Sequence, residues 1–180
     1  MNYDLLFFQY FNSFAGRSDI FDALILFAAS YLQYAVSLAV LVWLWRRRDA
    51  ALAIGRDILL TVFISRGLIA EAIRFIYKKP RPFEVLDVHQ VVNHSAGGAF
   101  PSGHAAFFFA LGATIFIYDK KWGTGFLAGA ALISIARVIG GVHWPLDIIA
   151  GAVVGILSVV LVHYGKRFWW RTDQNTKPTA

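Results

Sequence analysis

Long apolar runs separated by short charged stretches form the main pattern of this chain. A bilayer core about 30 Å thick needs roughly 20 apolar residues of helix, and residues 21–45 meet that length before the arginines at 46–48. Three more apolar runs, 102–118, 122–139 and 145–164, follow in the second half of the chain. The pattern predicts helices that cross a membrane.

Another run, residues 51–77, is apolar but carries charged residues, which are Arg56, Asp57, Arg66, Glu71 and Arg74. A helix this polar is costly to surround with lipid, so we expect it to be packed inside the bundle. Residues 5–14 form a short aromatic segment without the basic start or cleavage site of a signal peptide, which favours an interfacial helix. We therefore expect an all-α polytopic membrane helix bundle. It would be a single domain over residues 1–180, with about five spanning helices plus the N-terminal interfacial helix.

The composition indicates a chain solvated by lipid, because 58% of its residues are hydrophobic and only 16% are charged. The net charge of +6 does not indicate a nucleic-acid partner, since the charges punctuate apolar runs instead of gathering on one water-facing surface. The chain has no cysteine, which excludes a disulfide framework, a thiolate metal site and a cysteine nucleophile.

Basic residues are divided unevenly between the two ends of such a bundle. One end holds Arg46, Arg47, Arg48, Lys120, Lys121 and the tail residues Lys166, Arg167, Arg171 and Lys177. The other end holds Arg17, Lys78, Lys79 and Arg81. The positive-inside rule makes the first end cytoplasmic. Segments 78–101 and 140–144 are then expected on the outer side of the inner (plasma) membrane.

Three polar motifs lie on the expected outer side. In the first, Arg74 is followed after six residues by Arg81 and Pro82, and the prolines at 80 and 82 disfavour helix before each of them. The arginines would serve either as membrane anchors or as part of an anion site.

The second motif is the Pro-Ser-Gly-His sequence of residues 101–104, at the start of a predicted helix. Ser102 is a good N-cap, and Gly103 lets an anion approach the free backbone N–H groups, where the helix dipole also favours negative charge. His104 would be either a neutral structural residue or a proton donor.

The third motif is Arg137, then His143 six residues later, then Asp147 four residues further. Pro145 suits the first position of a helix, so His143 would precede that helix and Asp147 would lie in its first turn. Asp147 would either complement the helix N-terminus or accept from one imidazole nitrogen and leave the other free to attack.

The helix ends that carry these motifs converge on one side, so three arginines, two histidines and one carboxylate can share a site. Several fixed cations around a small space favour phosphate, which fits arginine forks well. The carboxylates do not cluster as magnesium ligands do, and His89 and His94 are interpreted as polar loop residues. No metal or other cofactor is therefore expected.

In this order the motifs of residues 74–147 resemble those of the type-2 phosphatidic acid phosphatase superfamily. That pattern reads Lys, six residues, Arg-Pro; then Pro-Ser-Gly-His; then Ser-Arg, five residues, His, three residues, Asp. The resemblance implies a nucleophile at His143, its orienter at Asp147 and a general acid at His104. It also implies a phosphate cradle made of Arg74, Arg81, Ser102, Gly103 and Arg137. Arg74 stands where lysine is usual, and Ala136 stands where serine is usual, with Ser134 nearby.

The implied chemistry is in-line attack by neutral His143 on phosphorus, with His104 protonating the leaving oxygen. The expected partners are a lipid phosphate or diphosphate and membrane lipid, with no nucleic acid and no obligatory protein partner. An outward site, with Lys78 and Lys79 beside Arg81, favours a polyprenyl diphosphate, which would be undecaprenyl diphosphate in a bacterium. The alternatives are phosphatidylglycerol phosphate, phosphatidate, a lipid A phosphate, or a catalytically silent lipid-phosphate binder.

Overall fold

The computed structural model describes residues 3–176, with side chains as far as residue 166, and every regular element in that range is a helix. The elements are α1 (Tyr3–Asn12), α2 (Asp19–Leu26), η1 (Phe27–Tyr31), α3 (Leu32–Arg46), α4 (Arg48–Val62), η2 (Phe63–Ile69), α5 (Ala70–Ile76), α6 (Pro82–Val85), α7 (Gly103–Tyr118), α8 (Lys120–Ile139) and α9 (Pro145–Thr176). The π-helical segments η1 and η2 lie within unbroken helix, so α2–α3 and α4–α5 are two continuous rods. The expected all-α bundle is confirmed.

Among the described residues, three helices are long and apolar enough to cross a membrane: Asp19–Arg46, Lys120–Ile139 and Pro145–Lys166. Helix α7 is apolar but shorter, with 16 residues, and the α4–α5 rod carries the charged residues. The five rods coincide with the five apolar runs of the sequence. That all five span the bilayer stays a prediction.

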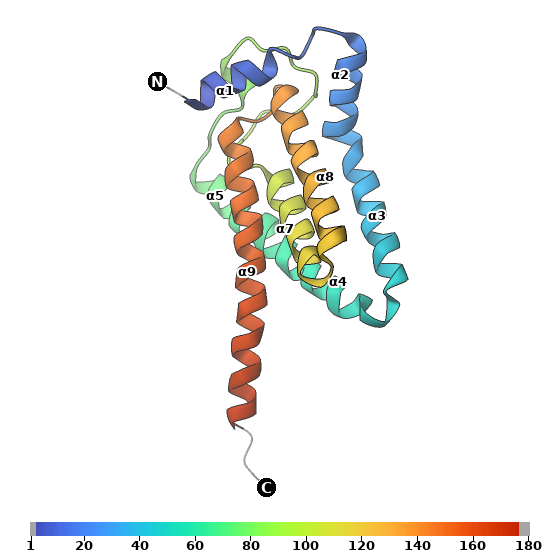
Figure 1. Cartoon of the computed structure of the whole chain (residues 1–180). Coiled ribbons are helices and arrows are strands. Elements are labelled where there is room, and N and C mark those ends of the chain that lie inside the picture. Colours follow the sequence, from blue (N-terminus) through green and yellow to red (C-terminus); the bar gives the residue numbers. More distant parts are fainter. Residues whose placement is uncertain (1–2, 177–180) are drawn as a thin grey trace.

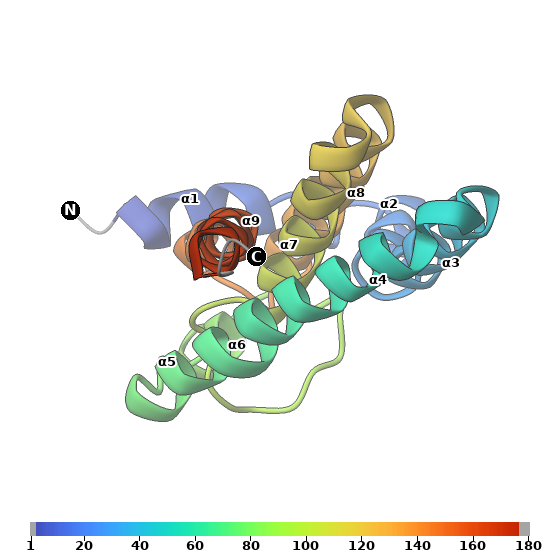
Figure 2. The same cartoon turned by 90° about the horizontal axis from the view of Figure 1, so that it is seen from below.

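Helix α7 lies at the centre of the bundle, between α8, α9 and the α4–α5 rod (Figure 2). Its Phe108, Leu111 and Ile115 pack in a core cluster with side chains of α3, α4 and α8. Apolar residues that face these neighbours on all sides explain why α7 is the most buried helix.

The α4–α5 rod lies at one edge of the bundle, so the expectation that this polar run is packed inside is wrong (Figure 2). Its Leu52, Leu59 and Phe63 are exposed on the outside of the protein. The charged residues are instead paired: Asp57 accepts from Tyr118 of α7 and Lys166 of α9, and Arg66 pairs with Glu71. The pairing lowers the cost of the charges on a rod whose exposed side chains include Leu52, Leu59 and Phe63.

Small residues bring the start of α9 close to the start of α7, which is the region of the predicted site. A Cβ added at Gly155 would lie 2.8 Å from both Ala106 O and Ala110 N, and one at Gly151 would lie 2.5 Å from Ser102 O. Glycine at these positions permits backbone contact between the two helices. The contact fixes residues 102–106 beside residues 145–155.

The two ends of the bundle hold different segments (Figure 1). Helix α1 and the 140–144 turn lie at the upper end, while the α3–α4 and α7–α8 turns and the end of α9 lie at the lower end. Helix α1 runs crosswise to α9, as expected of a helix at the membrane interface. The side chains of Arg167 and Arg171 and all of Lys177 lie outside the described part of the chain.

Candidate active site

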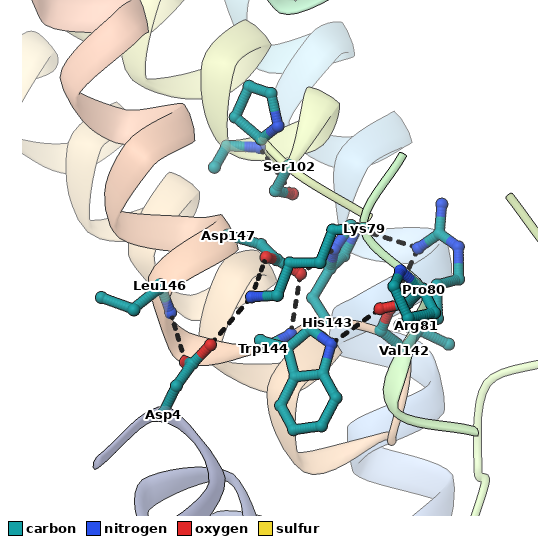
Figure 3. A network of polar contacts seen from close by, with 12 residues as sticks. Asp4, Lys79, Pro80, Arg81, Ser102, Val142, His143, Trp144, Leu146 and Asp147 are labelled. Carbon is teal, nitrogen blue, oxygen red and sulfur yellow. Dashed lines mark hydrogen bonds and ion pairs between the residues drawn. The ribbon is translucent and has the colours of Figure 1, made fainter. Parts of the chain in front are cut away.

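His143 lies in the short turn between α8 and α9 and is almost completely buried, with 1% of its side chain exposed. Gly141, at φ +85°, provides the left-handed conformation that turns the chain just before it. The His143 ring lies between a carboxylate and a guanidinium (Figure 3). Its Nδ1 is 3.4 Å from Asp147 Oδ2, and its Nε2 is 3.3 Å from Arg81 Nη1. A carboxylate that holds Nδ1–H leaves the Nε2 lone pair available for attack.

The protonation state of His143 follows from its surroundings. Burial lowers its pKa well below the ordinary value, and the charges of Arg137, Arg81 and Arg74 lower it further. The imidazole is therefore neutral at neutral pH, which is the form that can act as a nucleophile.

Asp147, in the first turn of α9, is fully buried and has several partners (Figure 3). Its Oδ2 accepts from the backbone N–H of Trp144 at 2.9 Å, and its Oδ1 accepts from Lys79 Nζ at 2.9 Å. Its backbone oxygen accepts from the N–H of Ser102 at 2.9 Å, which ties the start of α9 to the start of α7. Both oxygens of the carboxylate are therefore held in place.

Two arginines present buried N–H groups without a partner among the described residues. Arg81 Nη1 donates to Val142 O at 3.0 Å, while its Nε has no hydrogen bond. Arg137 Nη1 donates to Ala29 O at 3.2 Å, while its Nε and Nη2 have none. Buried unsatisfied guanidinium groups are costly. An oxyanion with several oxygens would satisfy them, and phosphate has this chemistry.

Arg74, the third arginine, is partly used to hold the chain before α7. Its Nε and Nη2 donate to Pro101 O at 3.0 and 2.8 Å, and its Nη1 contacts Glu71 Oε1 at 3.2 Å. It also lines an open cavity of about 550 Å³ with Lys78, Arg81 and His94. The cavity, whose lining also includes Glu71 and Glu84, is large enough for a phosphate group beside Arg81. His94 is thus nearer to the site than its interpretation as a polar loop residue implied.

The start of α7 has the geometry predicted from its sequence. Ser102 is the N-cap, fully buried, and its Oγ accepts from the N–H of Ala105. Gly103 leaves room for Arg66, since an added Cβ would lie 2.9 Å from Arg66 Cδ. His104 Nε2 lies 3.1 Å from Gln33 Oε1 of α3. A second cavity, of about 260 Å³, is lined by Gln33, Arg66 and His104.

The structure brings some predicted site residues into direct contact and gives others unexpected partners. His143 contacts both Asp147 and Arg81, whereas His104 contacts Gln33. Lys79, which was expected beside the substrate, lines the 550 Å³ cavity, and its ammonium group is held by Asp4 and Asp147. Asp4, Gln33 and Arg66 were missed as site residues. In the sequence, each of these three residues is a polar residue within an apolar or aromatic run. That pattern does not indicate which residue it contacts.

A family model described as the PAP2 superfamily matches residues 57–171. The chain belongs to the PAP2 superfamily. It is accordingly a membrane lipid phosphatase, which confirms the class of enzyme that the motifs predicted.

Relatives of this PAP2 protein cover most of its length. It is 30% identical to the "Bacitracin transport permease protein BcrC" of Bacillus licheniformis, over 90% of this chain and 77% of the relative. It is 27% identical to the "Undecaprenyl-diphosphatase BcrC" of Bacillus subtilis, over 87% of this chain and 80% of the relative. The crystal structure of LpxE from Aquifex aeolicus has the same fold, with a TM-score of 0.77, 23% identity and coverage of 91% of this chain and 96% of that one.

Proposed function

We propose that this PAP2 phosphatase hydrolyses a polyprenyl diphosphate to the monophosphate through a phosphohistidine intermediate on His143, without a metal. The observation that supports this mechanism best is the position of the His143 ring between Asp147 and Arg81. The carboxylate orients the nucleophile, and the guanidinium lies beside the nitrogen that attacks. A phosphoryl group that bound at this nitrogen would have its oxygens beside the positive charge of Arg81.

In the first step, Nε2 of neutral His143 attacks the terminal phosphorus in line with the leaving oxygen, and the bond from phosphorus to that oxygen breaks. His104 gives its proton to the leaving oxygen. In the second step, His104 takes a proton from water, which attacks phosphorus and releases inorganic phosphate and free His143. Arg74, Arg81 and Arg137, with the N–H groups behind Ser102 and Gly103, hold the charge on the equatorial oxygens in both steps.

Positive charge beyond this cradle supports a diphosphate as the substrate. Lys78 lines the 550 Å³ cavity with Arg74 and Arg81. Arg66 lines the other cavity, beside His104. In an in-line reaction the leaving group departs on the side away from the nucleophile, so Arg66, which is paired with Glu71 in the free protein, would meet the phosphate that stays on the lipid. A lipid monophosphate has no second phosphate group that could bind these additional cations.

The names of relatives support the same substrate class. Two of them are the "Undecaprenyl-diphosphatase BcrC" of Bacillus subtilis and the "Putative undecaprenyl-diphosphatase YbjG" of Escherichia coli, which is 27% identical over 87% of this chain. We also propose an inner-membrane location with the site on the outer side, based on the uneven distribution of basic residues. A reporter fused after Ala180 should then behave as cytoplasmic and one inserted near Val91 as extracytoplasmic. Both reporters on one side would refute this topology.

Turnover against a small panel of lipids tests the proposed substrate. The panel is undecaprenyl diphosphate, phosphatidylglycerol phosphate, phosphatidate and lipid A, measured with one preparation in one detergent. We expect the highest kcat/KM for the diphosphate. Lipid A is included because a "Lipid A 1-phosphatase" of Rhizobium johnstonii is 31% identical over 57% of this chain. A preference for any of the other three would reject the substrate and keep the chemistry, while no phosphate release from any lipid would favour a silent binder.

A further inference from the structure

Helix α1 contacts the catalytic end of the bundle through one face, formed by Asp4, Phe8 and Asn12 at four-residue spacing. Phe8 is 1% exposed, and its ring centroid lies 5.2 Å from that of Trp144, the residue after His143. Asn12 Nδ2 donates to Ile139 O at the end of α8 at 2.8 Å. These two contacts fix the helix against both sides of the His143 turn.

Asp4 is the third residue of this face and makes two polar contacts (Figure 3). Its Oδ1 accepts from the backbone N–H of Leu146 at 2.9 Å, which satisfies one of the free N–H groups in the first turn of α9. Its Oδ2 accepts from Lys79 Nζ at 2.8 Å. The Asp4 side chain is only 10% exposed, so both contacts are largely shielded from water.

Lys79 connects Asp4 to the catalytic carboxylate. Its Nζ lies 2.8 Å from Asp4 Oδ2 and 2.9 Å from Asp147 Oδ1, and it is also 5.3 Å from the centre of the Trp144 ring. Burial by itself lowers the pKa of Lys79, but the hydrogen bonds and charges of the two carboxylates outweigh it and raise the pKa above its ordinary value. The lysine therefore stays charged and shared between two carboxylates.

We propose that Asp4 is a positioning residue for the His143–Asp147 pair and that it acts through Lys79. Asp4 attracts the ammonium group of Lys79 toward α1. Lys79 therefore binds Oδ1 of Asp147 and leaves Oδ2 free to accept from His143. Asp147 Oδ2 stays directed at His143 Nδ1. The helix at the membrane interface thereby completes the catalytic site, and a chain with a displaced α1 would have a misaligned nucleophile.

Loss of the Asp4 charge leaves Lys79 with Asp147 as its single carboxylate partner. The ammonium group would then move toward Asp147 and compete with His143 for its negative charge. Because Nδ1 and Oδ2 are already 3.4 Å apart, a small displacement removes that contact. The expected effect is on the chemical step, since neither Asp4 nor Asp147 lies among the arginines that hold phosphate.

The test is a double-mutant cycle between Asp4→Asn and Lys79→Met, with phosphate release from farnesyl diphosphate as the assay. Asn keeps an oxygen for Leu146 N–H but carries no charge for Lys79. We expect Asp4→Asn to lower kcat about tenfold with KM within twofold. Lys79→Met should lower kcat as well, and adding Asp4→Asn to it should change kcat less than twofold, because the connecting lysine is gone.

Asp4→Glu is the conservative variant and should restore most of the lost kcat. Asp19→Asn, in the exposed first turn of α2, is the matched control and should leave kcat unchanged. Thermal unfolding in detergent checks that each variant folds, and Lys79→Gln replaces Lys79→Met if the latter does not fold. An Asp4→Asn kcat within twofold of wild type would overturn the proposal, as would an equal tenfold loss with and without Lys79.

This inference rests on the proposed role of His143 as the nucleophile. His143→Ala in the same assay separates the two ideas. Activity in His143→Ala rejects the proposed function. An inactive His143→Ala together with an unaffected Asp4→Asn rejects only the positioning role.

Discussion

Nη1 of Arg81 lies 3.3 Å from Nε2 of His143, on the ring nitrogen that faces away from Asp147. The Arg81 guanidinium can only donate, and in the tautomer whose Nδ1–H faces Asp147 the His143 Nε2 has a free lone pair, so in that tautomer Arg81 donates an N–H to Nε2. A phosphate that enters must take over that N–H before attack can begin. In the proposed mechanism, Arg81 would contact His143 in the free enzyme and hold the phosphoryl group in the complex.

Replacement of the two histidines should have different consequences. His143→Ala removes the nucleophile and should abolish turnover of every lipid substrate. His104→Ala should lower turnover about 10²- to 10⁴-fold for an ordinary leaving group. With a leaving group that needs no proton, His104→Ala should accumulate an acid-labile phosphoenzyme, detected with ³²P-labelled substrate. Near wild-type phosphate release by His143→Ala would show that another residue attacks.

The pH profile should report the lowered pKa of His143. Since burial and the arginines disfavour the imidazolium, the neutral nucleophile persists as pH falls, and kcat/KM should decline only below pH 6.5, the ordinary histidine value. Bound phosphate partly neutralises the arginines and raises the pKa, so the acidic limb of kcat should lie at higher pH than that of kcat/KM. Steady-state rates from pH 4 to 8 would measure both, and a kcat/KM limb at or above 6.5 would contradict the environment of His143.

Arg66→Gln should distinguish diphosphates from monophosphates. Without the Arg66 charge, kcat/KM for a polyprenyl diphosphate should fall about 10- to 150-fold, because a charge-assisted contact contributes about 1.5–3 kcal/mol. The value for phosphatidate should stay within twofold. Arg56→Gln is the control, since Arg56 belongs to the same rod but is 71% exposed near the opposite end. Equal losses for both substrates would place Arg66 outside the second-phosphate site.

Metal independence is tested by chelation. EDTA should leave the rate unchanged, because arginines and helix N–H groups supply the positive charge that a metal provides elsewhere. Vanadate, which adopts the five-coordinate geometry of phosphorus in transfer, should inhibit competitively. A loss of activity in EDTA that magnesium restores would overturn the metal-free mechanism.

The helices and the polar residues near His143 could be predicted from the sequence, because both depend on local sequence patterns. The apolar run 122–139 became α8, and the Ser102 cap began α7 as its type and place predicted. His143 lies in the turn just before α9, and Asp147 lies four residues later in the first turn of that helix, so the two residues are close in the sequence. The contact between His143 and Asp147 therefore depends on their short separation in the sequence and on the turn that precedes α9.

The position of the α4–α5 rod in the bundle could not be predicted from local sequence patterns. Its charges suggested an interior helix, but pairs such as Asp57 with Lys166 neutralise them at the edge of the bundle. Residues 109 positions apart in the chain form that pair. A hydrophobicity profile treats each charged residue separately and does not include the residue with which it forms an ion pair.

By itself the sequence determined the class of fold, the family and the residues available for phosphate chemistry, because helix periodicity, helix caps and motif spacing are local properties of the chain. Only the tertiary structure decided what Lys79 and Asp4 do. Lys79 stands next to the phosphate motif in the sequence, yet its flexible side chain reaches two buried carboxylates contributed by α1 and α9. A long side chain binds whichever partner the packing of distant helices places within its reach, and that packing depends on contacts between residues far apart in the chain.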